Sequence, residues 1–111
     1  MKKYCLALDL KNDAALIAEY KKHHEKIWPE IKDSLIDAGI ENLEIYNVSN
    51  RLFMILEVND SFSFEKKTAM DLESPKVQEW EDLMWKYQQK LPFAKANEKW
   101  MLMDKIYQLK E

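Results

Sequence analysis

Residues 51–58 form a run in which nearly every side chain is large and apolar. In an extended strand, neighbouring side chains point to opposite faces of the sheet. One face of this strand would carry Phe53 and Ile55, and the other would carry Leu52, Met54, Leu56 and Val58. Because both faces are apolar, any sheet that contains this strand has to be covered on both sides.

The rest of the chain supplies three more strand patterns and the start signals of several helices. The strands are expected at residues 3–10, 42–48, 51–58 and 99–109. Cap residues and prolines predict helices after Asp13, from Pro29, from about Ser63 through Met70, and from Pro75 to Leu91. This order is that of an α+β, ferredoxin-like fold, with a four-stranded antiparallel sheet and its helices on one face. We expect a single domain over residues 1–111.

The second face of such a sheet would stay open in a single chain. Besides residues 51–58, the segment 99–109 is apolar on both sides, with Trp100 and Leu102 on one and Met101, Met103, Tyr107 and Leu109 on the other. A contiguous apolar face of this kind exceeds what a soluble monomer usually exposes. We therefore expect a homodimer through the sheet faces, which makes a dimeric α+β barrel.

Composition excludes several classes of function. The net charge of -3 argues against a nucleic-acid partner, and no stretch approaches the ~20 apolar residues of a membrane span. The single cysteine, Cys5, excludes an internal disulfide and any multi-cysteine metal site, which fits a cytoplasmic location. With Gly39 as the only glycine, no glycine-rich phosphate loop is present, so no nucleotide cofactor is expected.

A tyrosine and a histidine in the first helix are the candidates for chemistry. Tyr20 and His24 are four residues apart, so they lie one above the other on the apolar face, whereas His23 lies near its boundary. A half-buried imidazole beside a phenol can move protons near neutral pH. The same spacing also suits a structural histidine bonded to a backbone carbonyl, and a core tyrosine with its hydroxyl at the rim. No second histidine stands at a metal-ligand spacing from His24, so no metal site is expected.

The four tryptophans are a second candidate feature. Core packing accounts for most of them, but indole faces also stack on the C–H faces of sugars while a few polar groups set the orientation. The indoles are Trp28, Trp80, Trp85 and Trp100, and the acids and phenol that could accompany them are Glu30, Glu57, Glu81, Asp104 and Tyr46.

At these residues the chain resembles the L-rhamnose mutarotase family. The resemblance is carried by Tyr20-x-x-x-His24-x-x-Ile27-Trp28-Pro29-Glu30, by the strands 42–46 and 53–57, by Trp80, and by the ending Lys99-Trp100…Met103…Ile106-Tyr107…Leu109. That ending, with Gln88-Gln89-Lys90-Leu91-Pro92 before it, is similar to a sub-branch linked to L-fucose or related 6-deoxy sugars.

The resemblance implies a dimeric enzyme that interconverts the α and β anomers of a 6-deoxy sugar without a metal or organic cofactor. It implies that His24 is the proton donor, that Tyr20 binds substrate, and that Trp80 contributes to the sugar pocket. Leu43 and Glu81 stand at two further substrate-binding positions, where better-known members have an aromatic residue and a second tryptophan. These two differences bear on which sugar is preferred.

The predicted reaction suits the residue types. Mutarotation opens the sugar ring to an aldehyde and closes it again, and one imidazole helped by a phenol or carboxylate can move the protons in both directions. Two other classes share the predicted fold: a cofactor-free oxygenase of the dimeric α+β barrel type, and a non-catalytic sugar-binding dimer. Fold alone does not choose among these three.

Overall fold

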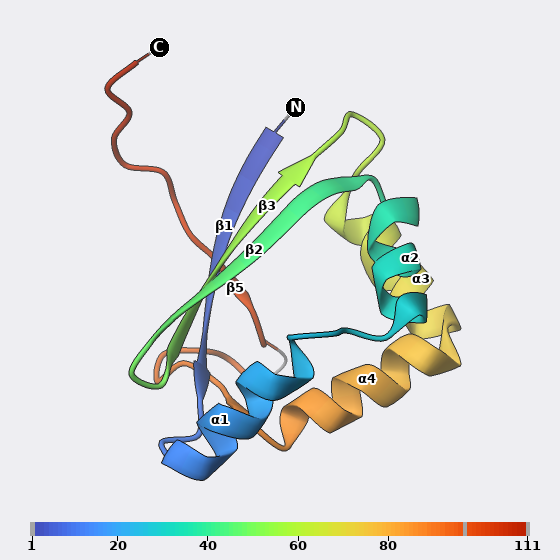
Figure 1. The fold of residues 1–111 in the computed structure, drawn as a ribbon. Coiled ribbons are helices and arrows are strands. Elements are labelled where there is room, and N and C mark those ends of the chain that lie inside the picture. Colours follow the sequence, from blue (N-terminus) through green and yellow to red (C-terminus); the bar gives the residue numbers. More distant parts are fainter. Residues whose placement is uncertain (1, 97, 111) are drawn as a thin grey trace.

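The computed structural model describes residues 2–96 and 98–110. The elements follow the order β1 (Lys2–Leu10), α1 (Ala14–His23), α2 (Pro29–Asp37), β2 (Ile40–Val48), β3 (Arg51–Val58), α3 (Phe64–Glu73), α4 (Pro75–Trp85), β4 (Gln88–Gln89) and β5 (Met101–Leu102). All strand pairs are antiparallel, in the order β2-β3-β1, and the two short strands β4 and β5 both pair with the remaining edge of β1. The four helices lie on one face of this sheet (Figure 1).

The helices begin where capping residues favour them. The Asp13 carboxylate accepts a hydrogen bond from the backbone N–H of Leu16 at the start of α1. Ser63 and Ser74 cap α3 and α4 in the same way. Pro29 occupies the first turn of α2, where its missing N–H is not needed. Local sequence thus determines where each helix begins.

Three predicted helix ends are wrong. The apolar pattern predicts that the first helix reaches Ile27, and the third, expected to end at Met70, continues to Glu73. Helix α1 ends at His23, so His24 is its C-cap residue. Helix α4 ends at Trp85 rather than near Leu91, because the chain turns to pair Gln88 with Leu10 and Gln89 with Asp9. The spacing of Tyr87 and Leu91 imitates a longer helix because both side chains still reach the core.

The predicted strand over residues 99–109 is reduced to Met101–Leu102, with one further hydrogen bond from the Met103 N–H to the Cys5 carbonyl. Residues 103–110 then leave the sheet, as the C-terminal end of the ribbon in Figure 1 shows. Their large apolar side chains are exposed, and Ile106 is 95% exposed. An apolar alternation predicts an extended segment, but not whether a neighbouring strand is present to pair with it.

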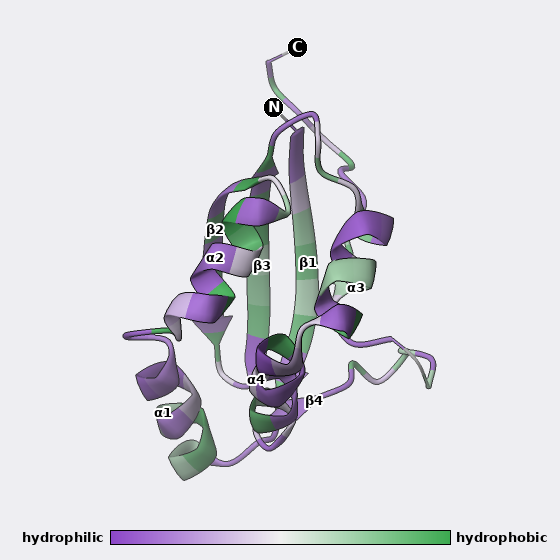
Figure 2. Cartoon of the chain, turned by 90° about the vertical axis from the view of Figure 1, so that its right-hand side faces the viewer, coloured by the Kyte–Doolittle hydropathy of each residue, from purple (hydrophilic) through white to green (hydrophobic). Residues whose placement is uncertain are grey.

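The main core lies between the sheet and the helices. It includes Leu8, Leu10, Leu52, Leu56 and Val58 from the strands, as the alternation in residues 51–58 predicts. Figure 2 shows the helices in front of the sheet, with hydrophobic residues along β1 and β3 behind them. On the opposite face, Phe53 and Ile55 are only half-buried, and Tyr46 is 53% exposed. That second face is left open by the single chain.

Candidate active site

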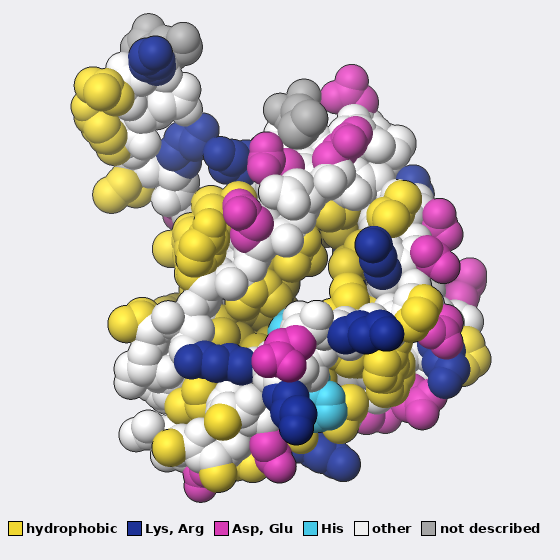
Figure 3. Space-filling view, in the orientation of Figure 1, with side chains coloured by type: hydrophobic (Ala, Val, Ile, Leu, Met, Phe, Trp, Pro, Cys, Tyr) yellow, Lys and Arg dark blue, Asp and Glu magenta, His cyan; other side chains and the backbone are white. Residues whose placement is uncertain are grey.

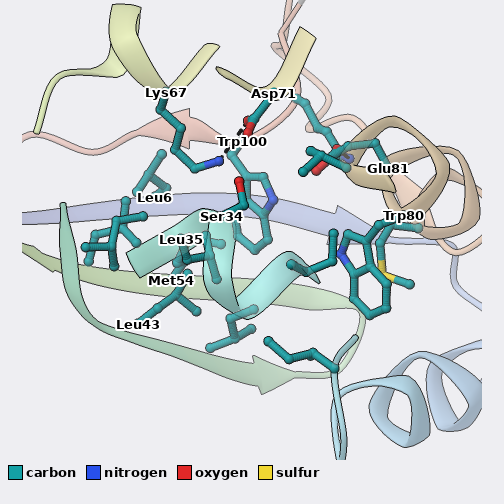
Figure 4. Close-up of a pocket in the computed structure, with 18 of the residues that line it drawn as sticks. Leu6, Ser34, Leu35, Leu43, Met54, Lys67, Asp71, Trp80, Glu81 and Trp100 are labelled. Carbon is teal, nitrogen blue, oxygen red and sulfur yellow. Dashed lines mark hydrogen bonds and ion pairs between the residues drawn. The ribbon is translucent and has the colours of Figure 1, made fainter. Parts of the chain in front are cut away.

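A cavity of about 460 Å³ lies between the sheet and the helices. Most of the side chains around it are apolar and come from β1, β2, β3, α2 and α4. In Figure 4, Leu43 and Met54 come from the strands, Ser34 and Leu35 from α2, and Trp80 from α4. Hydrophobic side chains also line a hollow in the face shown in Figure 3. An apolar cleft with a few convergent polar groups is the usual form of a small-molecule site.

The structure brings all five predicted site residues to this cavity. They are Tyr20, His24, Leu43, Trp80 and Glu81. They come from α1, from the turn after it, from β2 and from α4. Among the other candidates Trp100 also lines the cavity, whereas Trp28, Trp85, Glu30, Glu57, Asp104 and Tyr46 do not.

His24 is held in one orientation by its own backbone. Its Nδ1 lies 2.8 Å from the carbonyl oxygen of Tyr20. A carbonyl can only accept a hydrogen bond, so Nδ1 carries a proton and Nε2 of the neutral ring keeps the free electron pair. The carbonyl contact expected for a structural histidine is therefore present, yet it leaves Nε2 available for proton transfer.

Aromatic neighbours keep the His24 imidazole in a half-buried position. Its ring centroid is 4.4 Å from that of Tyr20 and 5.7 Å from that of Trp80, the latter in an edge-on arrangement. Burial lowers the pKa of His24 from 6.5, the hydrogen bond to Tyr20 opposes this, and nearby His23 adds to the lowering. The imidazole is therefore mostly neutral at pH 7 and suited to accept a proton.

Tyr20 is buried, with 3% of its surface exposed. The side-chain amide of Gln88 donates a hydrogen bond from Nε2 to the Tyr20 hydroxyl oxygen at 3.2 Å. Burial raises the pKa of Tyr20 to about 12, although this hydrogen bond acts in the opposite direction. Tyr20 therefore keeps its proton at neutral pH. Because Gln88 occupies an acceptor position of the oxygen, the hydroxyl proton is free to be donated elsewhere.

Glu81 and Lys99 form an ion pair at another part of the lining. The Lys99 ammonium also lies 4.8 Å from the centre of the Trp85 ring, a cation–π distance. These contacts give the lining a fixed carboxylate beside Trp80, at the place where the resemblance implied a substrate-binding residue.

Sequence reasoning did not single out several polar residues of the lining. They are Ser34, Lys67, Thr68, Asp71, Gln88 and Lys99. Gln88 had a readable signal, since it follows Met84 by four residues and so continues the apolar stripe with a polar side chain. His23 behaves differently from His24, because its Nε2 lies 3.2 Å from the hydroxyl of Tyr87 and it does not line the cavity.

Over residues 2–96 and 98–110, no group of three or more histidine, cysteine or acidic side chains is arranged to hold a metal ion. The helices in the same ranges are all too short or too polar to cross a lipid bilayer.

Comparison with solved structures agrees with the observed fold. The crystal structure of an L-rhamnose mutarotase from Formosa agariphila superposes with a TM-score of 0.72 and 21% sequence identity, covering 99% of this chain and 100% of that one. The tetracenomycin F2 cyclase of Streptomyces glaucescens, a type II polyketide cyclase, gives a TM-score of 0.61 at 14% identity, covering 100% and 99%. The predicted ferredoxin-like α+β fold is thus confirmed, and the second match shows that other chemistry uses it too.

Sequence relatives are more specific. An L-fucose mutarotase from Xanthomonas campestris pv. campestris is 42% identical over 113 residues, which span 100% of this chain and 90% of that protein. An L-rhamnose mutarotase from Listeria monocytogenes serovar 1/2a is 33% identical over 81 residues, or 71% of this chain and 68% of that protein. A family model described as L-rhamnose mutarotase matches residues 3–109. Because this match takes in almost the whole chain, the chain belongs to the L-rhamnose mutarotase family, as its sequence predicted.

Proposed function

We propose that this protein interconverts the α and β anomers of a 6-deoxyhexose, with L-fucose preferred to L-rhamnose. Family membership supports an aldose mutarotase rather than an oxygenase or a non-catalytic sugar-binding dimer. The observation that carries the proposal is the meeting of Tyr20, His24 and Trp80 in one cavity, with Nε2 of His24 left free by its Nδ1 contact. The higher identity to an L-fucose mutarotase supports the order of the two sugars.

The reaction needs one proton to move between two oxygens on the same carbon. In the proposed mechanism, Nε2 of neutral His24 removes the proton of the anomeric hydroxyl. The electron pair left on that oxygen forms the aldehyde carbonyl, and the bond from the anomeric carbon to the ring oxygen breaks. The imidazolium then gives its proton to the ring oxygen, while the Tyr20 hydroxyl donates a hydrogen bond to that oxygen. Rotation about the bond between the first two carbons and reversal of these steps give the other anomer.

The walls of the cavity suit the apolar end of a deoxy sugar. Leu43, Ile45 and Met54 from the sheet line the same cavity as Trp80. An indole packs against the C–H face of a pyranose, and a buried C6 methyl contributes about 0.8 kcal/mol. We propose that Leu43 contacts this methyl and that Glu81 accepts a hydrogen bond from a sugar hydroxyl.

Saturation-transfer NMR tests the proposed activity directly. One anomeric proton of L-fucose is saturated, and the loss of signal at the other is compared with and without protein, then repeated for L-rhamnose and D-glucose. We expect faster exchange for the 6-deoxy sugars than in buffer alone. Exchange that is not accelerated for any of these sugars would contradict the proposal, and oxygen consumption with an aromatic substrate would favour the oxygenase alternative.

We also infer a homodimer through the open sheet face, in a cytoplasmic protein. Phe53 and Ile55 are half-buried on that face, the Tyr46 and Phe53 rings lie 6.4 Å apart, and the exposed apolar segment 103–110 continues from its edge. A second copy would cover this surface. Light scattering should give the mass of two chains for the parent protein and of one chain for Phe53→Lys. A parent protein that stays monomeric at micromolar concentration would rule the dimer out.

A further inference from the structure

Two buried oxygen atoms lack a hydrogen-bond partner among the described residues, and both belong to side chains that line the cavity. They are Oδ1 of Asp71 and Oε1 of Gln88. Folded proteins pair almost all buried polar atoms, because leaving one unpaired is unfavourable. Both atoms have almost no exposed surface in this structure, so a ligand in the cavity would pair with them after a small rotation of each side chain. Both atoms are acceptors, so the ligand has to supply hydroxyl or amine donors.

Gln88 stands next to the proposed reacting groups. Its side chain is almost fully buried, with 4% of the residue exposed, and its Nε2 is already engaged with the hydroxyl of Tyr20. The free Oε1 belongs to the same amide group, so it lies close to the oxygen that is proposed to contact the sugar ring oxygen. A sugar hydroxyl that reaches Gln88 must therefore be near the anomeric carbon.

Asp71 approaches the cavity from a different direction. It lies on α3, and Figure 2 shows α4 between α3 and α1. Its Oδ2 accepts a hydrogen bond from the Lys67 ammonium at 2.7 Å, and both side chains are less than one quarter exposed. Figure 4 shows this pair beside Ser34 and Trp100. The pairing with Lys67 engages Oδ2 and leaves Oδ1 without a hydrogen-bond partner.

The stereochemistry of the two sugars suggests which hydroxyls Gln88 and Asp71 would contact. L-Fucose and L-rhamnose have the same atoms and differ only in the configuration of the hydroxyls at C2 and C4. The C2 hydroxyl adjoins the anomeric carbon, and the C4 hydroxyl is across the ring from it. On the proposed mutarotase function, these are the hydroxyls that the two positions would reach.

We propose that Gln88 Oε1 accepts a hydrogen bond from the C2 hydroxyl and Asp71 Oδ1 from the C4 hydroxyl, so that these two residues determine which 6-deoxyhexose is accepted. This inference rests on the proposed function for the orientation of the sugar. A site built to pair with a hydroxyl discriminates strongly against a sugar that cannot supply it, because the buried acceptor is then left unpaired.

The test measures binding and anomer exchange for three sugars: L-fucose, 2-deoxy-L-fucose and 4-deoxy-L-fucose. Dissociation constants come from NMR titration of the parent protein, Gln88→Met and Asp71→Asn. The Asn amide would turn its carbonyl toward Lys67 and present an N–H₂ group where Oδ1 stood. The matched control is Glu79→Gln, the same change of carboxylate to amide at an exposed position of α4 that pairs with Lys76 outside the cavity.

We expect the parent protein to bind each deoxy sugar about 3- to 10-fold more weakly than L-fucose. Gln88→Met should weaken L-fucose binding by a similar factor but have no effect on binding of the 2-deoxy sugar. Asp71→Asn should weaken L-fucose binding about 10-fold and have no effect on the 4-deoxy sugar. Glu79→Gln should leave all three constants unchanged.

Several results would overturn the inference. Equal losses on all three sugars would indicate a structural effect, and an exchanged pattern between the two deoxy sugars would reverse the assignment. Parent protein that binds the three sugars equally would also refute it, independently of whether the variants fold. Binding that follows the expected pattern without any anomer exchange would contradict the proposed function while leaving the recognition by Gln88 and Asp71 intact.

Discussion

Replacing His24 by glutamine should remove most of the catalysis, while the same change at His23 should not. Both residues are half-buried neighbours, but only His24 lines the cavity, and His23 instead contacts the Tyr87 hydroxyl. A well-placed acid–base group contributes about 10²–10⁴-fold to a rate. We therefore expect His24→Gln to lose about this much of the enzymatic anomer exchange. Since glutamine can still donate to the Tyr20 carbonyl, the local fold should be retained.

The pH profile supplies a second readout of the same group. Burial lowers the pKa of His24 below 6.5, so the neutral imidazole needed as a base is lost only at a pH below that value. The exchange rate of the parent protein should be level near pH 7 and fall at a pH below 6.5, by about tenfold per unit once most of the imidazole is protonated. This acid limb should be absent from His24→Gln and present in His23→Gln.

The same shift has a thermodynamic consequence. An unfolded chain binds the His24 proton more tightly than the folded protein, so the folded state loses stability as the pH falls below 6.5. The loss continues until the pH passes the lowered pKa of the folded state, at no more than about 1.4 kcal/mol per pH unit. Denaturant unfolding at several pH values measures this loss of stability.

If the two glutamine variants lose anomer exchange equally, or if His24→Gln keeps the acid limb of the pH profile, His24 is not the acid–base group.

Three further predictions concern stability and are measured by denaturant unfolding. Tyr20→Phe should lower the unfolding free energy by about 1–3 kcal/mol, because the buried Gln88 Nε2 loses its acceptor, and adding Gln88→Leu should restore part of it. Gly39→Ala should cost about 1–3 kcal/mol, since φ is +98° and the added Cβ would lie 2.6 Å from a side-chain oxygen. Arg51→Met should lower the unfolding free energy, because the buried Asp9 carboxylate loses its 2.7 Å and 3.1 Å hydrogen bonds.

Local signals predicted the elements on which the site stands. The Asp13 cap, Pro29 and the Ser74-Pro75 pair give three of the four helix starts, and the structure has each at its expected place. The alternation in residues 51–58 correctly separated the cavity face from the open face. These features depend on neighbouring residues in the chain, so the sequence alone expresses them.

Tertiary pairing decided the features that were predicted wrongly. Helix α4 ends at Trp85 because Gln88 and Gln89 pair with β1 instead of continuing the helix. No helix-stop residue near Trp85 indicates this end in the sequence. The same holds for residues 104–110, whose apolar pattern fits a strand but which form no strand in the described part of the chain. An apolar periodicity indicates which side chains have to be buried. Whether the backbone is helical or extended there depends on the tertiary neighbours that bury them.

Some polar residues of the site were predictable from local sequence, and others depend on tertiary packing. Tyr20 and His24 were visible because an imidazole on an apolar helix face is unusual. Lys67 and Asp71 have the spacing of an ordinary solvated ion pair, and Lys76 with Glu79 on the next helix is such a pair. The Lys67–Asp71 pair lies in the cavity wall because of where α3 packs, which its spacing in the sequence does not indicate. A polar residue within the apolar face of a helix can thus be recognised as a site candidate from sequence. A polar residue that reaches the cavity only through the packing of its helix cannot.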